Sequence, residues 1–159
     1  MKKRLLLTYA TRPLGIRVAN LMAPDFEVLA ATAEDIPSVF IDKYIPCPAV
    51  QSASYVHEML TLALDHHVAY ILPLGLKEIA ALGRSMALFE EYGIQVLCPD
   101  MEILPSLSIL SNPPKALPLH LMANGKDLLE QGLAGPSISN GLGVFSDSGE
   151  EFLLTAIQD

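Results

Sequence analysis

The sequence predicts an α/β protein whose parallel sheet carries helices on both faces, in three layers. Short apolar runs, typical of strands buried on both faces, alternate with stretches in which apolar residues recur at helical spacing. The chain has 159 residues, of which 51% are hydrophobic, so one domain can bury a sizeable core without a disulfide or metal. After residue 110 the regular alternation ends, which indicates a small α+β appendage over residues 111–159.

The first strand is predicted at Leu5–Tyr9, a continuous apolar run. Pro13 then begins a helix, since its missing N–H would have no helical partner in the first turn. Apolar side chains line one side of this helix at Leu14, Val18, Leu21 and Met22. A second strand is expected at Glu27–Ala31 and a short third one at Val39–Ile41.

A second group of elements follows the loop around Cys47. Ser52 or Ser54 caps a helix that ends at His66 and His67, and a strand at Val68–Leu72 follows. A helical stripe comes next, formed by Leu76, Ile79, Leu82, Met86 and Phe89. Gly93 is suited to cap that helix in a left-handed conformation. The remaining elements are a strand at Ile94–Leu97 and a short helix within Met101–Leu110.

The segment after Ser111 begins with a linker, Asn112–Lys115. A short helix is expected at Lys126–Gln131, with Gly132 as its stop, and a strand at Val144–Phe145. Ser148 and Glu151 have the spacing of a capping box, which predicts a final helix containing Phe152, Leu153 and Ala156.

Charge and hydropathy exclude several functions. The net charge is −8, and residues 81–159 alone carry −7, from 3 basic and 10 acidic residues. The one basic cluster is Lys2, Lys3 and Arg4, so a nucleic-acid partner is not expected. No apolar stretch reaches the ~20 residues that span a bilayer, and Arg12 interrupts the first apolar run. We therefore expect a cytoplasmic protein with no membrane partner.

Sequence motifs of common catalytic and cofactor sites are absent. The first turn holds only Gly15 where a dinucleotide site needs three glycines, and no lysine follows a phosphate-binding glycine loop. Cys47 and Cys98 are far apart without metal-ligand spacing, which favours structural thiols in a reducing compartment. His66 and His67 would point about 100° apart on a helix and cannot easily bind one ion. The sequence predicts no catalytic and no metal-binding residue.

The turns after the first strand and the strand at 68–72 form the candidate ligand site. Both turns are expected at the carboxyl edge of the parallel sheet, where such sheets bind ligands. The candidate residues are Ala10, Thr11, Arg12, Gly15, Pro73, Gly75, Lys77 and Glu78. Arg12 offers a forked donor for a small carboxylate or phosphate. In the alternative interpretation Arg12 and Lys77 are simply solvated and the glycines serve the turns.

Three segments carry a resemblance to a known family. They are RLLLTYATRPLGIRVANLM, FEVLAATAEDIPSVFIDKYIPCPAV and ILPLGLKEIAALGRSMALFEEYGIQVLCPD. In this order they resemble the pre-ATP-grasp domain of ATP-grasp ligases, such as the carbamoyl-phosphate synthase large subunit. The resemblance implies a Rossmann-like domain over residues 1–110. It also implies a vestigial or partial ATP-grasp lobe over residues 111–159.

The resemblance departs from the family in its chemistry. Gly135, Pro136 and Ser137 stand where the family has its ATP-binding lysine, and the metal-binding second lobe does not follow before Asp159. Phosphoryl transfer depends on metal ions and cationic groups to stabilise developing charge. We therefore expect no cofactor for this chain alone, with ATP and magnesium bound only if a complementary lobe is supplied.

Three functions remain open from the sequence. The first is a non-catalytic or incomplete ATP-grasp-type protein that binds a small substrate or docks onto a catalytic partner. The second is a subunit of a split ATP-dependent carboxylate–amine ligase that another chain completes. The third is a Rossmann-like interaction module without a ligand. High apolar content favours docking, either onto a catalytic chain or into a homo-oligomer.

Overall fold

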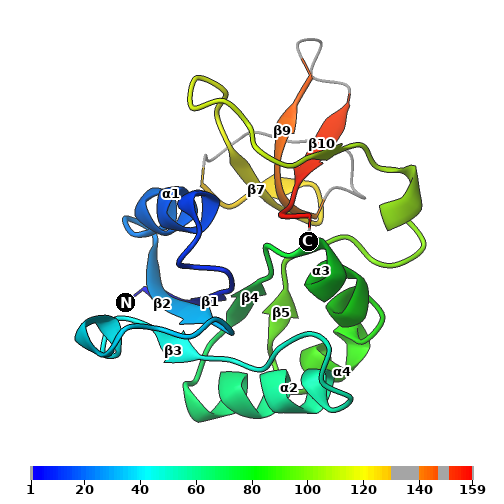
Figure 1. Ribbon diagram of the computed structural model, residues 1–159. Helices are drawn as coiled ribbons and strands as arrows, with labels where there is room; N and C mark the ends of the chain where they lie inside the picture. The colour runs from blue at the N-terminus through cyan, green and yellow to red at the C-terminus, as the bar shows by residue number, and fades with distance from the viewer. Residues whose placement is uncertain (1, 130–139, 147–150, 159) are drawn as a thin grey trace.

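A five-stranded parallel sheet forms the first part of the computed structural model, which describes residues 2–129, 140–146 and 151–158 (Figure 1). Its strands are β1 (Lys3–Leu7), β2 (Phe26–Thr32), β3 (Ile45–Pro46), β4 (Tyr70–Leu72) and β5 (Gln95–Val96). They lie in the order β3-β2-β1-β4-β5, and every pairing is parallel. The predicted α/β class with a parallel sheet is confirmed.

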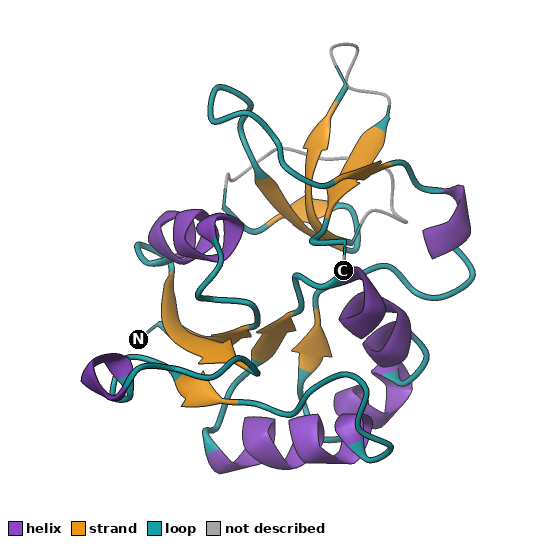
Figure 2. Ribbon diagram, in the orientation of Figure 1, coloured by secondary structure: helices purple, strands orange, loops and turns teal. Residues whose placement is uncertain are grey.

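The central strand β1 is buried on both faces. Leu5, Leu6 and Leu7 are all fully buried, because alternate side chains enter two different cores. Leu6 packs in the core under α2 (Tyr55–Asp65), α3 (Leu76–Gly83) and α4 (Met86–Glu91). Leu5 and Leu7 pack in the core that α1 (Pro13–Met22) covers from the opposite face. Figure 2 shows this arrangement, with α1 apart from the other three helices.

The predicted helix from Leu76 to Phe89 is two helices. Helix α3 ends at Gly83 and α4 starts at Met86. A Cβ at Gly83 would lie only 3.0 Å from the carbonyl oxygen of Pro99, so this glycine allows a close backbone approach. Glycine also has a low helix propensity, which favours the break there. Gly93 has φ of +76°, which confirms its predicted left-handed conformation.

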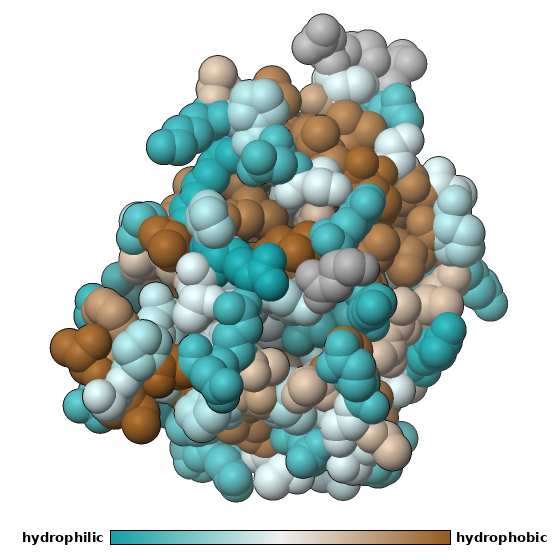
Figure 3. All heavy atoms as spheres, in the orientation of Figure 1, coloured by the Kyte–Doolittle hydropathy of each residue, from teal (hydrophilic) through white to brown (hydrophobic). Residues whose placement is uncertain are grey.

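The predicted strand at Val39–Ile41 is wrong. Residues 38–40 form a 3₁₀ turn, η1 (Ser38–Phe40), in which Val39 is 78% exposed. Short strand Ile45–Pro46 takes the edge position instead, and the Cys47 N–H continues the pairing with a 3.0 Å bond to the Thr32 carbonyl. Apolar spheres gather at this turn in Figure 3, at its lower left. An apolar run alone does not specify a strand when neighbouring residues can pair better.

The second part of the chain is a mixed five-stranded sheet with the order β6-β10-β9-β7-β8. Its strands are β6 (Ile109–Leu110), β7 (His120–Ala123), β8 (Lys126–Asp127), β9 (Gly141–Phe145) and β10 (Phe152–Thr155). Only β6 and β10 pair in parallel. The sheet therefore begins inside the predicted first domain, at Ile109, and the predicted helix at Met101–Leu110 is reduced to the 3₁₀ turn η2 (Leu104–Ser106).

Both helices predicted in this part are wrong among the described residues. Lys126 and Asp127 belong to a hairpin, because Asn124 and Gly125 have φ of +54° and +81° and form its tight turn. Phe152 begins strand β10. The predicted helix residues Glu130 and Gln131 and the capping residue Ser148 lie outside the described residues. The predicted strand at Val144–Phe145 is confirmed as the end of β9.

The end of β10 is attached to the first part of the chain. The Ile157 N–H donates to the Leu74 carbonyl at 2.6 Å, and the Leu76 N–H donates to the Ile157 carbonyl at 2.8 Å. Gly75 and Ile157 thus form a parallel bridge at the start of α3. The described part of the chain contains no helix that is long and apolar enough to cross a membrane.

Candidate functional site

A cavity of about 190 Å³ opens at the carboxyl ends of β1, β2 and β3. Its charged lining residues are Arg12, Glu34 and Glu78. The others are Tyr9, Thr32, Ala33, Cys47, Ala49, Val50 and Gln51. The turns after β1, β2 and β3 and the first turn of α3 supply these side chains, because the carboxyl ends of parallel strands lie at one edge of the sheet.

Glu78 is the buried charged residue of the cavity, at 3% exposure. Its Oε1 accepts a 2.6 Å bond from the Thr8 hydroxyl, and its Oε2 accepts a 3.0 Å bond from the Tyr55 hydroxyl. The Gly75 N–H also donates to Oε1, at 3.3 Å. Thr8 follows β1 and Gly75 follows β4, so the network lies where the strand order reverses. Parallel sheets bind ligands at this point.

The amino end of α3 is built around the same network. The Thr8 hydroxyl accepts a 2.9 Å bond from the Leu74 N–H, while Glu78 accepts the Gly75 N–H. Gly75 is the cap residue before α3, and the Glu78 side chain accepts its N–H as in a capping box. This accounts for a carboxylate and a hydroxyl at a buried position, and it fixes the orientation of Glu78 before any ligand arrives.

Tyr9 forms one wall of the cavity in a left-handed backbone conformation, with φ of +52°. A Cβ at Gly75 would lie 2.4 Å from Cε2 of the Tyr9 ring, so the ring and the Gly75 backbone are in direct contact. A non-glycine residue in this conformation costs free energy and is often found at functional sites. The glycine therefore makes room for the aromatic wall.

The rim of the cavity is polar and partly exposed. The Arg12 guanidinium donates through Nε to Oε1 of Glu34 at 2.7 Å, with nearly half of each side chain exposed. Arg12 also lies 5.6 Å from the centre of the Tyr9 ring. An exposed ion pair of this kind contributes little to stability, so the two groups can exchange partners with a ligand at small cost.

The Cys47 thiol and the Tyr55 hydroxyl, which lie near Glu78, keep their protons at neutral pH. Burial, and then the charge of Glu78, raises the pKa of the Cys47 thiol to about 12. Burial and Glu78 likewise raise the pKa of Tyr55 well above its usual value. A protonated thiol is a poor nucleophile, and a protonated phenol is no base. The raised pKa values therefore disfavour covalent chemistry by Cys47 and base chemistry by Tyr55.

The structure separates the predicted site residues into two groups. Arg12 and Glu78 line the cavity, with Gly75 directly behind the Tyr9 ring. Thr11 lines a neighbouring hollow beside Glu34. Lys77 is exposed and is not among the residues that line the cavity, because adjacent positions on a helix point in different directions.

The remaining predicted residues serve packing. Ala10 is 2% exposed and donates its N–H to the Ala31 carbonyl at 3.1 Å. A Cβ at Gly15 would lie 2.2 Å from the Tyr9 carbonyl oxygen, so this glycine allows α1 to approach the turn. Pro73 is buried in the turn before α3.

Several cavity residues were missed from the sequence. Thr32 ends β2 and Glu34 follows it, whereas Cys47, Ala49, Val50 and Gln51 follow β3. The third strand was predicted at Val39–Ile41, whereas the edge strand is Ile45–Pro46 and ends just before Cys47. Residues 47–51 were therefore not expected at the end of a strand. The sequence around Tyr55 does not indicate its bond to Glu78, because a buried aromatic residue on a helix is explained by packing alone.

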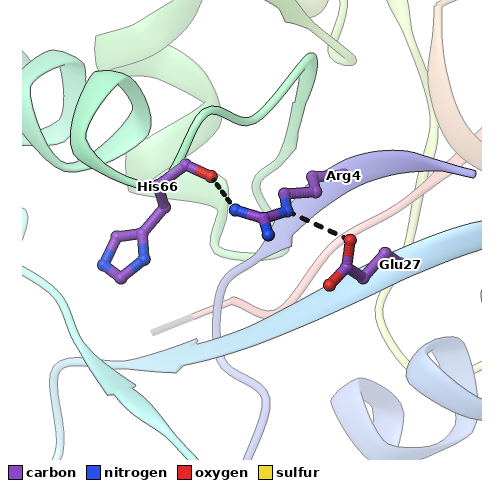
Figure 4. Close-up of polar contacts among 3 residues, drawn as sticks. All are labelled: Arg4, Glu27 and His66. Carbon is purple, nitrogen blue, oxygen red and sulfur yellow. Dashed lines mark hydrogen bonds and ion pairs between the residues drawn. The ribbon is translucent and has the colours of Figure 1, made fainter.

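The N-terminal basic cluster has structural partners at the opposite edge of the sheet. Arg4 donates through Nε to Glu27 at 3.0 Å and through Nη1 to the His66 carbonyl at 2.8 Å, at the end of α2 (Figure 4). The Lys2 ammonium bonds the Ala23 carbonyl at 2.9 Å. These contacts satisfy carbonyl groups at helix ends.

The described ranges contain no group of three or more His, Cys, Asp or Glu side chains that could hold a metal ion. His120 and Asp127 form a buried pair in the second sheet, with Nδ1 2.7 Å from Oδ2. Asp127 also accepts the Leu129 N–H at 3.0 Å. This pair fastens the β7–β8 hairpin.

The fold and the cavity define an α/β protein with a small cavity at the carboxyl edge of a parallel sheet. No family model and no curated protein matches the chain when their sequences are compared with it.

Proposed function

We propose that the chain is a Rossmann-like domain of the pre-ATP-grasp type that binds a small polar molecule and does not itself catalyse a reaction. One observation carries the proposal: the buried carboxylate of Glu78, bonded by Thr8 and Tyr55, lines a cavity at the carboxyl edge of the parallel sheet. A protein rarely buries a charge without a structural or binding purpose, because desolvation is costly.

The strand order β3-β2-β1-β4-β5 supports the Rossmann-like assignment, since doubly wound sheets reverse their order between the first and fourth strands. The mixed second sheet supports a separate lobe after the parallel sheet. Two free cysteines suit the reducing cytoplasm that we propose as the location of the protein.

The size of the cavity supports a small ligand. The volume of the cavity is about 190 Å³. Pockets that enclose drug-sized molecules measure about 300–1,000 Å³. The cavity is therefore too small to enclose a nucleotide, and it suits a compact polar metabolite.

A thermal-shift screen with a cavity-filling variant tests this function. Ala49 lines the cavity with an exposed side chain, so Ala49→Phe should fill its mouth and leave the fold intact. Ala87 is an exposed alanine on α4, and Ala87→Phe provides the matched control. We expect small polar compounds to raise the melting temperature of the wild type and of Ala87→Phe but not of Ala49→Phe. Equal stabilisation of all three proteins would contradict a ligand in this cavity.

A further inference from the structure

A second hollow, of about 440 Å³, lies at the amino ends of the parallel strands. Residues near the starts of β1, β2 and β4 and just after α2 line it, namely Lys2, Lys3, Arg4, Glu27, His67 and Ala69. Parallel strands all begin at one edge of their sheet and end at the other. This hollow and the cavity beside Glu78 therefore lie at opposite edges of the sheet.

The charge of this hollow is opposite to that of the protein as a whole. Two lysines and an arginine line it together with one glutamate, so these residues carry a net charge of +2, whereas the whole chain carries −8. The glutamate, Glu27, pairs with Arg4 at 3.0 Å, and about half of each side chain is exposed. Because an exposed ion pair contributes little to stability, an anion in the hollow can share the guanidinium with Glu27 at small cost.

The basic side chains have more donors than their structural contacts use. A guanidinium carries five N–H donors and an ammonium carries three. Arg4 donates through Nε to Glu27 and through Nη1 to the His66 carbonyl, and its third nitrogen, Nη2, makes neither of these bonds (Figure 4). Lys2 donates one hydrogen bond, to a backbone carbonyl. Within the described ranges, the Lys3 ammonium lies over a tyrosine ring and donates no hydrogen bond.

His67 adds an imidazole in a backbone conformation that favours glycine. Its φ is +54°, directly after His66, the residue that caps the end of α2. Glycine is the usual residue at this position of a helix end, because a side chain in the left-handed conformation costs free energy. The imidazole lines the hollow and has no bonding partner in the part of the chain that the structure describes. Residues in such conformations are concentrated at functional sites.

We propose that this hollow binds the phosphate group of a small metabolite. A phosphate group carries about two negative charges at neutral pH and has three strong acceptor oxygens. The Arg4 guanidinium can bond two of these oxygens as a fork, while the two ammonium groups and the imidazole of His67 donate from neighbouring elements. The volume of 440 Å³ leaves room for the rest of a small molecule. The site goes beyond the proposed function, because it is separate from the cavity at the other edge.

Titration of the wild-type chain with inorganic phosphate tests the proposal. Sodium acetate and sodium chloride at the same ionic strength are the reference probes. Binding is followed by the amide chemical shifts of residues 2–4, 27 and 66–69 in nuclear magnetic resonance spectra at neutral pH. We expect phosphate to shift these amides with a Kd at least about tenfold lower than that of acetate, as hydrogen bonds to charged groups allow. Equal shifts with phosphate and either reference probe, or no shift with phosphate, would overturn the proposal.

Two substitutions of opposite effect assign phosphate binding to the hollow. Lys3→Gln should raise the Kd at least about threefold, a modest factor because the charge is exposed. Glu27→Gln should lower the Kd, since it removes the carboxylate that competes for Arg4. Lys115→Gln and Glu102→Gln are the matched controls, because they change the net charge equally at exposed positions that do not line the hollow. If each substitution changed the Kd only as much as its control, general electrostatics would explain the binding and the proposal would be overturned.

His67→Gly separates binding from stability. Glycine relieves the left-handed backbone, so the melting temperature should stay the same or rise. The Kd for phosphate should rise in the same variant, because one donor is lost. A Kd that is unchanged both in His67→Gly and in Lys3→Gln would overturn the proposal.

Discussion

The Thr8 hydroxyl donates a 2.6 Å hydrogen bond to the carboxylate of Glu78, which lies 70 positions later in the chain. The bond joins the end of β1 to the first turn of α3, across the point where the strand order reverses. Because the same hydroxyl accepts the Leu74 N–H, Thr8 connects the sheet, the turn and the cavity.

Thr8→Val should destabilise the protein. Valine has a similar shape but no hydroxyl. In this fully buried position the Leu74 N–H would lose its acceptor, and the Glu78 carboxylate would lose one donor. Unsatisfied buried groups of this kind cost about 1–3 kcal/mol each. Urea unfolding measures the change in the free energy of unfolding. Thr61→Val is the matched control, since Thr61 is exposed and bonds only the His57 carbonyl of its own helix. A Thr8→Val variant as stable as this control would contradict the role of the network.

Gly75→Ala should also be destabilising, for a steric reason. Gly75 has φ of −81°, which any residue adopts, so the whole effect comes from the 2.4 Å approach of the new Cβ to the Tyr9 ring. Overpacking costs about 1–3 kcal/mol. In a protein that already carries Tyr9→Ala, Gly75→Ala should lower the free energy of unfolding much less. A double-mutant cycle measures this difference.

Gly93→Ala provides the contrast for this prediction. No atom lies within 4 Å of its added Cβ, but its φ of +76° disfavours alanine. We expect a loss of about 1 kcal/mol that Tyr9→Ala does not relieve. If Tyr9→Ala did not reduce the stability loss of either glycine substitution, the contact between Tyr9 and Gly75 would not be the cause of the loss in Gly75→Ala.

Stability should fall at alkaline pH. Burial raises the pKa of both Cys47 and Cys98 to about 12, from about 9 in the unfolded chain. Between these values the unfolded thiols lose their protons while the folded thiols keep them, so rising pH favours unfolding. The loss approaches about 1.4 kcal/mol per pH unit for each thiol. Urea unfolding under reducing conditions between pH 8 and about pH 11 measures it. Cys47→Ala should make the decline shallower, and an unchanged slope would show that this thiol does not contribute.

The isolated chain should not bind Mg-ATP tightly. The cavity is too small to enclose a nucleotide, and the described residues hold no cluster of metal ligands. Titration calorimetry with Mg-ATP should give no heat of binding at micromolar protein. A Kd in the low micromolar range would favour the split-ligase function over the non-catalytic one.

The parallel sheet was predictable because its strands carry a strong local signal. Leu5 to Leu7 form an apolar run that only a strand buried on both faces explains well. The second sheet gave a weaker signal. Phe152 lies in a strand because it pairs with β9. The local sequence around Phe152 does not show that this pairing partner exists. Tertiary pairing decided these residues against their helical pattern.

The candidate site was predictable in part for the same reason. Arg12 and Glu78 lie at the starts of the helices that follow two buried strands, and topology brings such positions to one edge. Lys77 and Glu78 are neighbours in the sequence, yet only Glu78 lines the cavity, and the direction of each side chain depends on where α3 begins. Cys47 and Gln51 required the correct edge strand, which the exposed apolar turn at Val39 concealed.

A crystal structure with the compound that most stabilises the chain in the thermal-shift screen tests the central claim most directly. The account predicts ligand density in the cavity between Tyr9 and Gln51, within hydrogen-bonding distance of the residues beside Glu78. Density confined to the second sheet or to the exposed surface around Lys77, with the cavity holding only water, would contradict it.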